Sequence, residues 1–225
     1  MLGPDARSVQ LQKWYDRLAA LVDQTREQLR SVPIADLVRR SGCTQDPDGA
    51  ICLPFWGEPY VVRLPDLSVE YANRAAAPTD FDQALLLTYL ATADGTPPAD
   101  GWITYHDLPD GMFYAQAFHG YAEVRLVREL EAGGIAAAGI AAFHRGMKRL
   151  GGEPEPIGSG AGNAAYAVQV LPRIRLAAVY WLGDEDFPSQ ASVLFPKSAP
   201  HYLSTDGLAV LGSHLVNRII QAALG

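Results

Sequence analysis

The chain has 225 residues, of which 48% are hydrophobic and 19% charged. This is enough apolar material for a folded core and too much for a disordered chain. The net charge of −7 disfavours nucleic acid and acidic membrane surfaces as partners, because both are bound through basic patches.

In the first half of the chain, apolar spacing and turn residues predict helices on either side of a group of strands. A turn or short linker, Thr96-Pro97-Pro98, follows. It is the best internal boundary, but the segments on either side look too small to fold alone, so we expect a single domain over residues 1–225. The elements expected before this linker are helices over Ser8–Leu29, Pro33–Arg40 and Asp80–Ala93, and strands over Ile51–Phe55, Tyr60–Leu64 and Leu67–Tyr71.

The second half repeats this order of helices and strands. Its strands are joined by short loops and not by helical crossovers, which predicts an α+β fold: a mainly antiparallel sheet with helices packed on it. We expect the strands of Ile51–Leu64 and Ala165–Phe195 to share one sheet. The elements expected here are helices over Glu123–Ala132, Ile135–Leu150 and the segment after Ser204, and strands over Ala165–Leu171, Ile174–Leu182 and Ser192–Phe195.

Two features bear on the compartment. The start of the chain lacks the pattern of a signal peptide, and no apolar run approaches the roughly 20 residues of a membrane span, so we expect a cytoplasmic protein. Cys43 and Cys52 are then expected to be free thiols, with a disulfide or a metal pair as the alternative.

Chemistry-bearing residues gather in two segments. Gly111–Tyr121 combines aromatic side chains with His119, and Leu171–Pro188 contains Arg173, Trp181 and the acidic run Asp184-Glu185-Asp186. The acidic run could bind a divalent cation, but an acidic turn cap is the favoured interpretation, since a hard-cation site draws ligands from more than one segment.

These segments, with Val193–Phe195 and Tyr202-Leu203, resemble an uncharacterised prokaryotic family known as domain of unknown function 3786. The resemblance runs from about Asp80 to the C-terminus. It transfers no activity to any residue, but some members of that family are attached to iron–sulfur modules, which implies a redox protein as a partner. Two cysteines cannot supply the usual four thiolates, so we expect no intrinsic iron–sulfur cluster.

Three functions remain open. In the first, His119, Tyr121, Arg173, Trp181 and Asp184 converge on one pocket for a small-molecule ligand that is flat and aromatic or tetrapyrrole-like, such as a haem or corrinoid. In the second, the chain is an enzyme with His119 as general acid/base and Asp184 or Glu185 positioning a substrate or metal. In the third, it is a scaffold that docks onto a redox partner.

Overall fold

The structure, a computed structural model, describes residues 22–132, 136–157 and 163–225. Its contacts cluster into two compact units, Met1–Thr96 and Pro97–Gly225, which meet in sequence at the proline-containing linker. Both units contain an antiparallel sheet with helices, so the predicted α+β class is confirmed. The single-domain assignment stays a prediction.

The first unit is built on a four-stranded antiparallel meander in the order β1-β2-β3-β4. Inward-facing residues of β2 and β3, such as Ile51, Leu53 and Val62, are buried, as are Leu86 and Leu87 of α3. Residues 22–30 are helical; the rest of the predicted first helix, from Ser8, lies outside the described residues. The elements after it are α2 (Ile34–Ser41), β1 (Thr44–Gln45), β2 (Ile51–Phe55), β3 (Glu58–Arg63), β4 (Ser68–Tyr71) and α3 (Asp80–Thr92).

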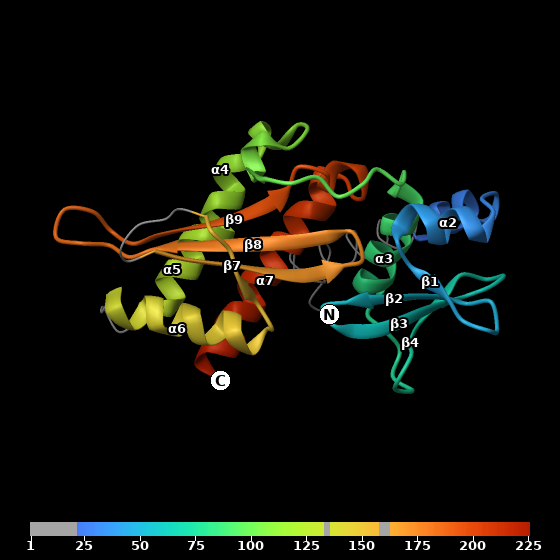
Figure 1. Cartoon of the computed structure of the whole chain (residues 1–225), viewed down its shortest axis with the longest axis horizontal. Helices are drawn as coiled ribbons and strands as arrows, with labels where there is room; N and C mark the ends of the chain where they lie inside the picture. The colour runs from blue at the N-terminus through green and yellow to red at the C-terminus, as the bar shows by residue number, and fades with distance from the viewer. Residues whose placement is uncertain (1–21, 133–135, 158–162) are drawn as a thin grey trace, which may run out of the picture. The chain divides into compact units, whose positions relative to one another are not determined.

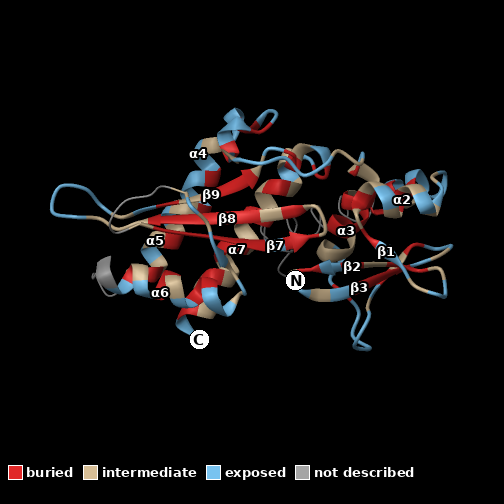
Figure 2. Ribbon diagram, viewed as in Figure 1, coloured by how far each residue is buried: buried red, intermediate tan, exposed pale blue. Residues whose placement is uncertain are grey.

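The second unit contains a five-stranded antiparallel sheet in the order β5-β9-β8-β7-β6. Its long central strands are mostly apolar, and they are buried along most of their length (Figure 2). The strands are β5 (Trp102–Thr104), β6 (Glu153–Pro154), β7 (Asn163–Leu171), β8 (Ile174–Trp181) and β9 (Gln190–Pro196).

Helices cover one face of this second sheet. Phe143 of α6 packs against Tyr166 of β7 and Tyr180 of β8, with ring centroids 6.0 and 5.4 Å apart. α6 also lies against α7 (Figure 1), and the two approach closely at Gly146, where a Cβ would lie 2.7 Å from the carbonyl oxygen of Ile219. The helical segments are η1 (Tyr105–Asp107), η2 (Gly111–Phe113), α4 (Ala115–Phe118), η3 (His119–Val124), α5 (Arg125–Leu130), α6 (Ala136–Arg149), η4 (Ala199–His201) and α7 (Thr205–Leu224).

One prediction about the sheets is wrong. The strands of Ile51–Leu64 and those of Ala165–Phe195 belong to two separate sheets. The alternation of apolar residues identifies a strand but not the strand that pairs with it. Any strand of matching length offers the same backbone hydrogen bonds, so the sequence did not show which strands share a sheet.

The C-terminal helix also differs from expectation. Among the described helices, α7 is long and apolar enough to span a membrane by length and composition. Leu208, Leu211, Leu215 and Ile219 on one side of it are nevertheless fully buried within the unit, as in the core helix of a folded domain.

Candidate functional site

The candidate site is centred on a hydrogen-bonded pair, His119 and Glu123. Both lie on η3, a π-helical turn between α4 and α5, and such turns often occur at functional sites. The spacing of four residues brings the Nδ1 of His119 to 2.7 Å from the Oε2 of Glu123. A carboxylate can only accept a hydrogen bond, so Nδ1 carries the proton.

The second oxygen of Glu123 is also engaged. Its Oε1 accepts the backbone N–H of Val193 at 2.9 Å. The last residue pair between β5 and β9 is Thr104 with Leu194, and Val193 is the next residue of β9. The Glu123 carboxylate therefore binds β9 at the point where β5 no longer pairs with it. The Glu123 side chain is only 12% exposed, whereas that of His119 is 60% exposed.

This arrangement fixes the chemistry of the imidazole. With Nδ1–H held by Glu123, the neutral form of the ring has its lone pair at Nε2. A histidine oriented by a carboxylate in this way is suited to bind a metal centre through Nε2 or to accept a proton there.

Aromatic rings anchor the same turn. Phe118 stacks on Tyr105 with centroids 4.4 Å apart, and Tyr121 meets the edge of Phe118 at 5.5 Å. Burial, followed by the negative charge of Asp206, raises the pKa of Tyr121. Tyr121 remains partly exposed, so it offers an aromatic surface two residues from His119.

The other three predicted site residues lie elsewhere. Arg173 precedes β8 while Trp181 ends it, and eight strand residues at ~3.3 Å each separate the two by about 26 Å. Trp181 also faces away from the helices, because it packs with Ala177, Val179 and Leu194 on the opposite face of the sheet from Tyr180. The prediction that all five residues line one pocket is therefore wrong.

Arg173 lines a different cavity, of about 220 Å³, together with Trp102, Glu155 and Arg175. Arg175 is already paired there, with its Nη2 2.6 Å from the Oε1 of Glu155. An aromatic ring and a guanidinium thus do come together, but the ring is Trp102, not Trp181.

Asp184 has a local structural role. Its Oδ1 accepts the backbone N–H groups of Asp186 and Phe187, both at 2.9 Å, which makes it the cap of its own turn, as favoured from the sequence. Within the described parts of the chain, no group of three or more acidic, histidine or cysteine side chains is arranged to hold a metal ion.

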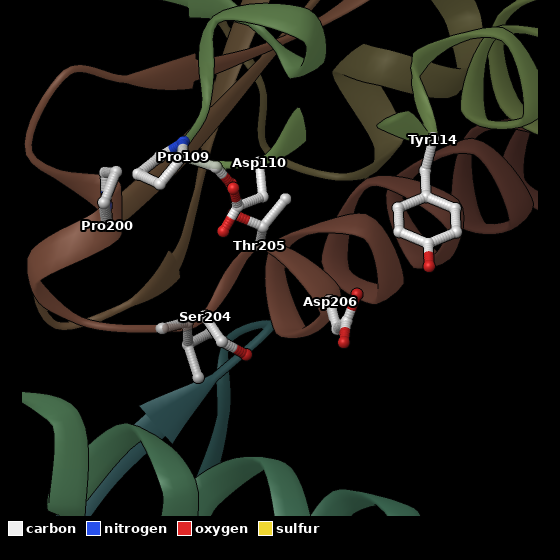
Figure 3. A pocket seen from close by; sticks show the side chains of 8 residues that line it. Pro109, Asp110, Tyr114, Pro200, Ser204, Thr205 and Asp206 are labelled. Atoms are coloured by element: carbon white, nitrogen blue, oxygen red, sulfur yellow. The ribbon is translucent and has the colours of Figure 1, made fainter. Parts of the chain in front are cut away.

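A cavity of about 360 Å³ lies at the start of α7. Figure 3 shows the labelled side chains around it, with the Asp206 carboxylate between Ser204 and the ring of Tyr114. The cavity is lined by Pro109, Asp110, Tyr114, Pro200, Leu203, Ser204, Thr205 and Asp206.

Comparison with known families gives a match to the family described as Domain of unknown function (DUF3786), over residues 33–218. The chain belongs to this family. The match begins well before Asp80, so the domain of unknown function includes most of the first unit as well as the second. No curated protein and no solved structure matches the chain.

Glu123 is a residue of the candidate site that the sequence alone did not reveal. It was expected only as the first residue of a helix, while the aromatic segment before it had no assigned structure. The four-residue spacing from His119 could have revealed the pair, had the helix been extended back through Gly120.

Proposed function

We propose that this DUF3786 protein binds a small ligand through His119, and that the ligand carries a metal with an open coordination position, as a haem or corrinoid does. The observation that carries the proposal is the fixed orientation of His119. Glu123 holds Nδ1 and is itself held by Val193, which leaves Nε2 available on a side chain that is largely exposed.

The described residues fit the metal of such a ligand better than its flat ring or its carboxylates. His119 supplies the nitrogen, whereas Tyr121, two residues further along the same turn, points to another side and meets the edge of Phe118. Arg173 lines a different cavity, with Trp102 and Glu155. When bound, the metal would supply the redox or ligand-exchange chemistry, and the protein would orient it.

Titration of the purified protein with haemin and with aquocobinamide, followed by absorption, tests the proposal. We expect a band shift typical of histidine ligation, lost in His119→Ala. Glu123→Gln should weaken binding by about 10- to 100-fold, the usual effect of losing the partner of a metal-binding histidine.

His106→Ala is the matched control. His106 is equally exposed and also lies beside an acid that a strand residue holds, since Asp107 accepts the backbone N–H of Thr104 at 3.1 Å. Its Nδ1, however, lies 3.5 Å from that acid, beyond the 2.7 Å that joins His119 to Glu123. Binding should be unchanged in this variant. If His119→Ala and His106→Ala behave alike, or if neither compound shifts the spectrum of the parent protein, the proposal is rejected.

A second candidate function is general acid/base catalysis by His119. The same hydrogen bond favours it, because a carboxylate that orients an imidazole is a recurring arrangement in catalytic sites. Hydrolysis of p-nitrophenyl acetate can report on the reactivity of the imidazole. A rate that falls in His119→Ala but not in His106→Ala, with no spectral response to either metal compound, would favour catalysis over ligand binding.

A further inference from the structure

Three consecutive large side chains on the second unit are exposed to solvent. Met112 and Tyr114 are each 62% exposed and Phe113 is 73% exposed. They occupy η2 and the residue after it, a tight segment with little room for these side chains to fold inward. Contiguous exposed apolar side chains on a folded domain often mark an interaction surface.

One of these side chains, that of Tyr114, lines the cavity at the start of α7. The acids Asp110 and Asp206 line the same cavity (Figure 3). Among the residues that the structure describes, neither acid forms an ion pair with a basic side chain.

Two carboxylates, Asp110 and Asp206, line the cavity. The charge of Asp206 contributes, after burial, to the raised pKa of Tyr121, and it contributes, after burial and Tyr121, to that of Tyr105. Two unpaired carboxylates beside a tyrosine ring form an environment that attracts a cation, through charge and through the ring face.

We propose that Met112, Phe113, Tyr114 and the cavity between Asp110 and Asp206 form a docking surface for a partner protein, which inserts a lysine or arginine flanked by apolar side chains. The cation enters the cavity, and the apolar neighbours cover Met112 and Phe113. Charge complementarity identifies this partner, because the cavity is acidic and the chain has a net charge of −7. The surface does not involve His119.

The test uses the full chain and short peptides as probes. Amide chemical shifts are followed by NMR during titration with acetyl-Leu-Lys-Leu-amide, and then with the same peptide carrying Gln or Glu in the central position. We expect saturable shifts of residues 110–114 and 204–207 with the lysine peptide, much weaker shifts with the Gln peptide, and none with the Glu peptide.

Variants separate the charged and apolar contributions. Asp110→Asn and Asp206→Asn should each weaken binding by about threefold to fivefold, as expected for a partly exposed charge pair. Phe113→Ser should weaken it as well. Glu185→Gln and Phe187→Ser alter an exposed acid and an exposed phenylalanine on the β8–β9 loop, and these controls should leave binding unchanged.

Several outcomes would overturn the proposal. Equal binding of the Lys and Gln peptides would show an apolar surface without charge selection. Concentration-dependent dimerisation that Phe113→Ser abolishes would show that a second copy covers the surface. Association with phosphatidylcholine vesicles that the same variant abolishes would assign it to a membrane.

Discussion

Glu123 joins a helical turn to a strand edge, because one of its carboxylate oxygens holds the backbone N–H of Val193 and the other holds the ring of His119. A single side chain therefore sets both the position of η3 on the sheet and the direction of the imidazole. Changes at this residue should affect stability as well as ligand binding, and the two effects can be separated by the choice of substitution.

Replacing Glu123 with Ala should lower the free energy of unfolding by about 1–3 kcal/mol, because the N–H of Val193 loses its acceptor in a largely buried place. Glu123→Gln keeps an acceptor oxygen and should lose less. Urea denaturation measures both values. Glu129→Ala, which removes an acid paired with exposed Arg128, should change stability by no more than about 0.5 kcal/mol. Equal losses in the Glu123 and Glu129 variants would contradict this role of the carboxylate.

The contact between α6 and α7 depends on a glycine. Gly146→Ala should destabilise the protein by about 1–3 kcal/mol, the usual cost of overpacking, since its Cβ would meet the carbonyl oxygen of Ile219 at 2.7 Å. Gly120→Ala makes the same chemical change on η3, where a Cβ would have no neighbour within 4 Å. That variant should be neutral or stabilised by about 0.5–1 kcal/mol. Thermal unfolding compares the two, and the reverse order would be evidence against close packing at Gly146.

Both cysteines are free thiols, as predicted from the sequence. Burial raises the pKa of the Cys43 thiol to about 11, above its usual value of 9.0. The folded state therefore favours the neutral thiol. This contribution to the free energy of unfolding is complete at pH values below the pKa of Cys43 in the unfolded chain, and it is lost as the pH rises toward the pKa of Cys43 in the folded protein. Between about pH 9 and about pH 11, the free energy of unfolding should fall by up to ~1.4 kcal/mol per pH unit from this group.

The measurement is urea denaturation across that pH range for the parent protein and for Cys43→Ala. The variant should be less stable at neutral pH, because it leaves a small gap, but its stability should fall less steeply at alkaline pH. Identical slopes in the two proteins would show that Cys43 does not titrate in this window.

The turn after β8 should behave as a structural cap and not as a cation site. Asp184→Ala removes the acceptor of two backbone N–H groups and should cost about 1 kcal/mol, whereas Asp184→Asn should cost less. Addition of millimolar Ca²⁺ or Mg²⁺ should leave the melting temperature of the parent protein unchanged. A rise in melting temperature that Asp184→Ala abolishes would restore the cation interpretation.

Local patterns in the sequence predicted many of the elements. The strand Ile51–Phe55 has the predicted bounds, and α7 begins directly after its cap, Ser204, as its side chain accepts the N–H of Gly207. These features depend on neighbouring residues, which is why periodicity and capping residues reveal them. The three short strands β1, β5 and β6 were missed, since two or three residues carry no detectable period.

Predictions that depend on distant contacts were less successful. The assignment of strands to one sheet failed, and so did the convergence of Arg173 and Trp181. Arg173 directly precedes β8 and Trp181 is its last residue, so the predicted strand itself already separates the two side chains. The hydrogen bond between Glu123 and Val193 joins positions 70 residues apart. No local sequence pattern predicts a hydrogen bond between residues so distant in the chain.

The same carboxylate has a consequence for solubility. Beyond its short pairing with β5, β9 has an edge that η3 covers, and this edge could recruit a strand from another molecule if η3 moved away. Glu123 occupies the N–H of Val193 on that edge and places a negative charge where an incoming backbone would have to lie. Loss of this acid would thus expose a template for intermolecular β-pairing, and Glu123→Ala should aggregate on storage sooner than its loss of stability alone would explain.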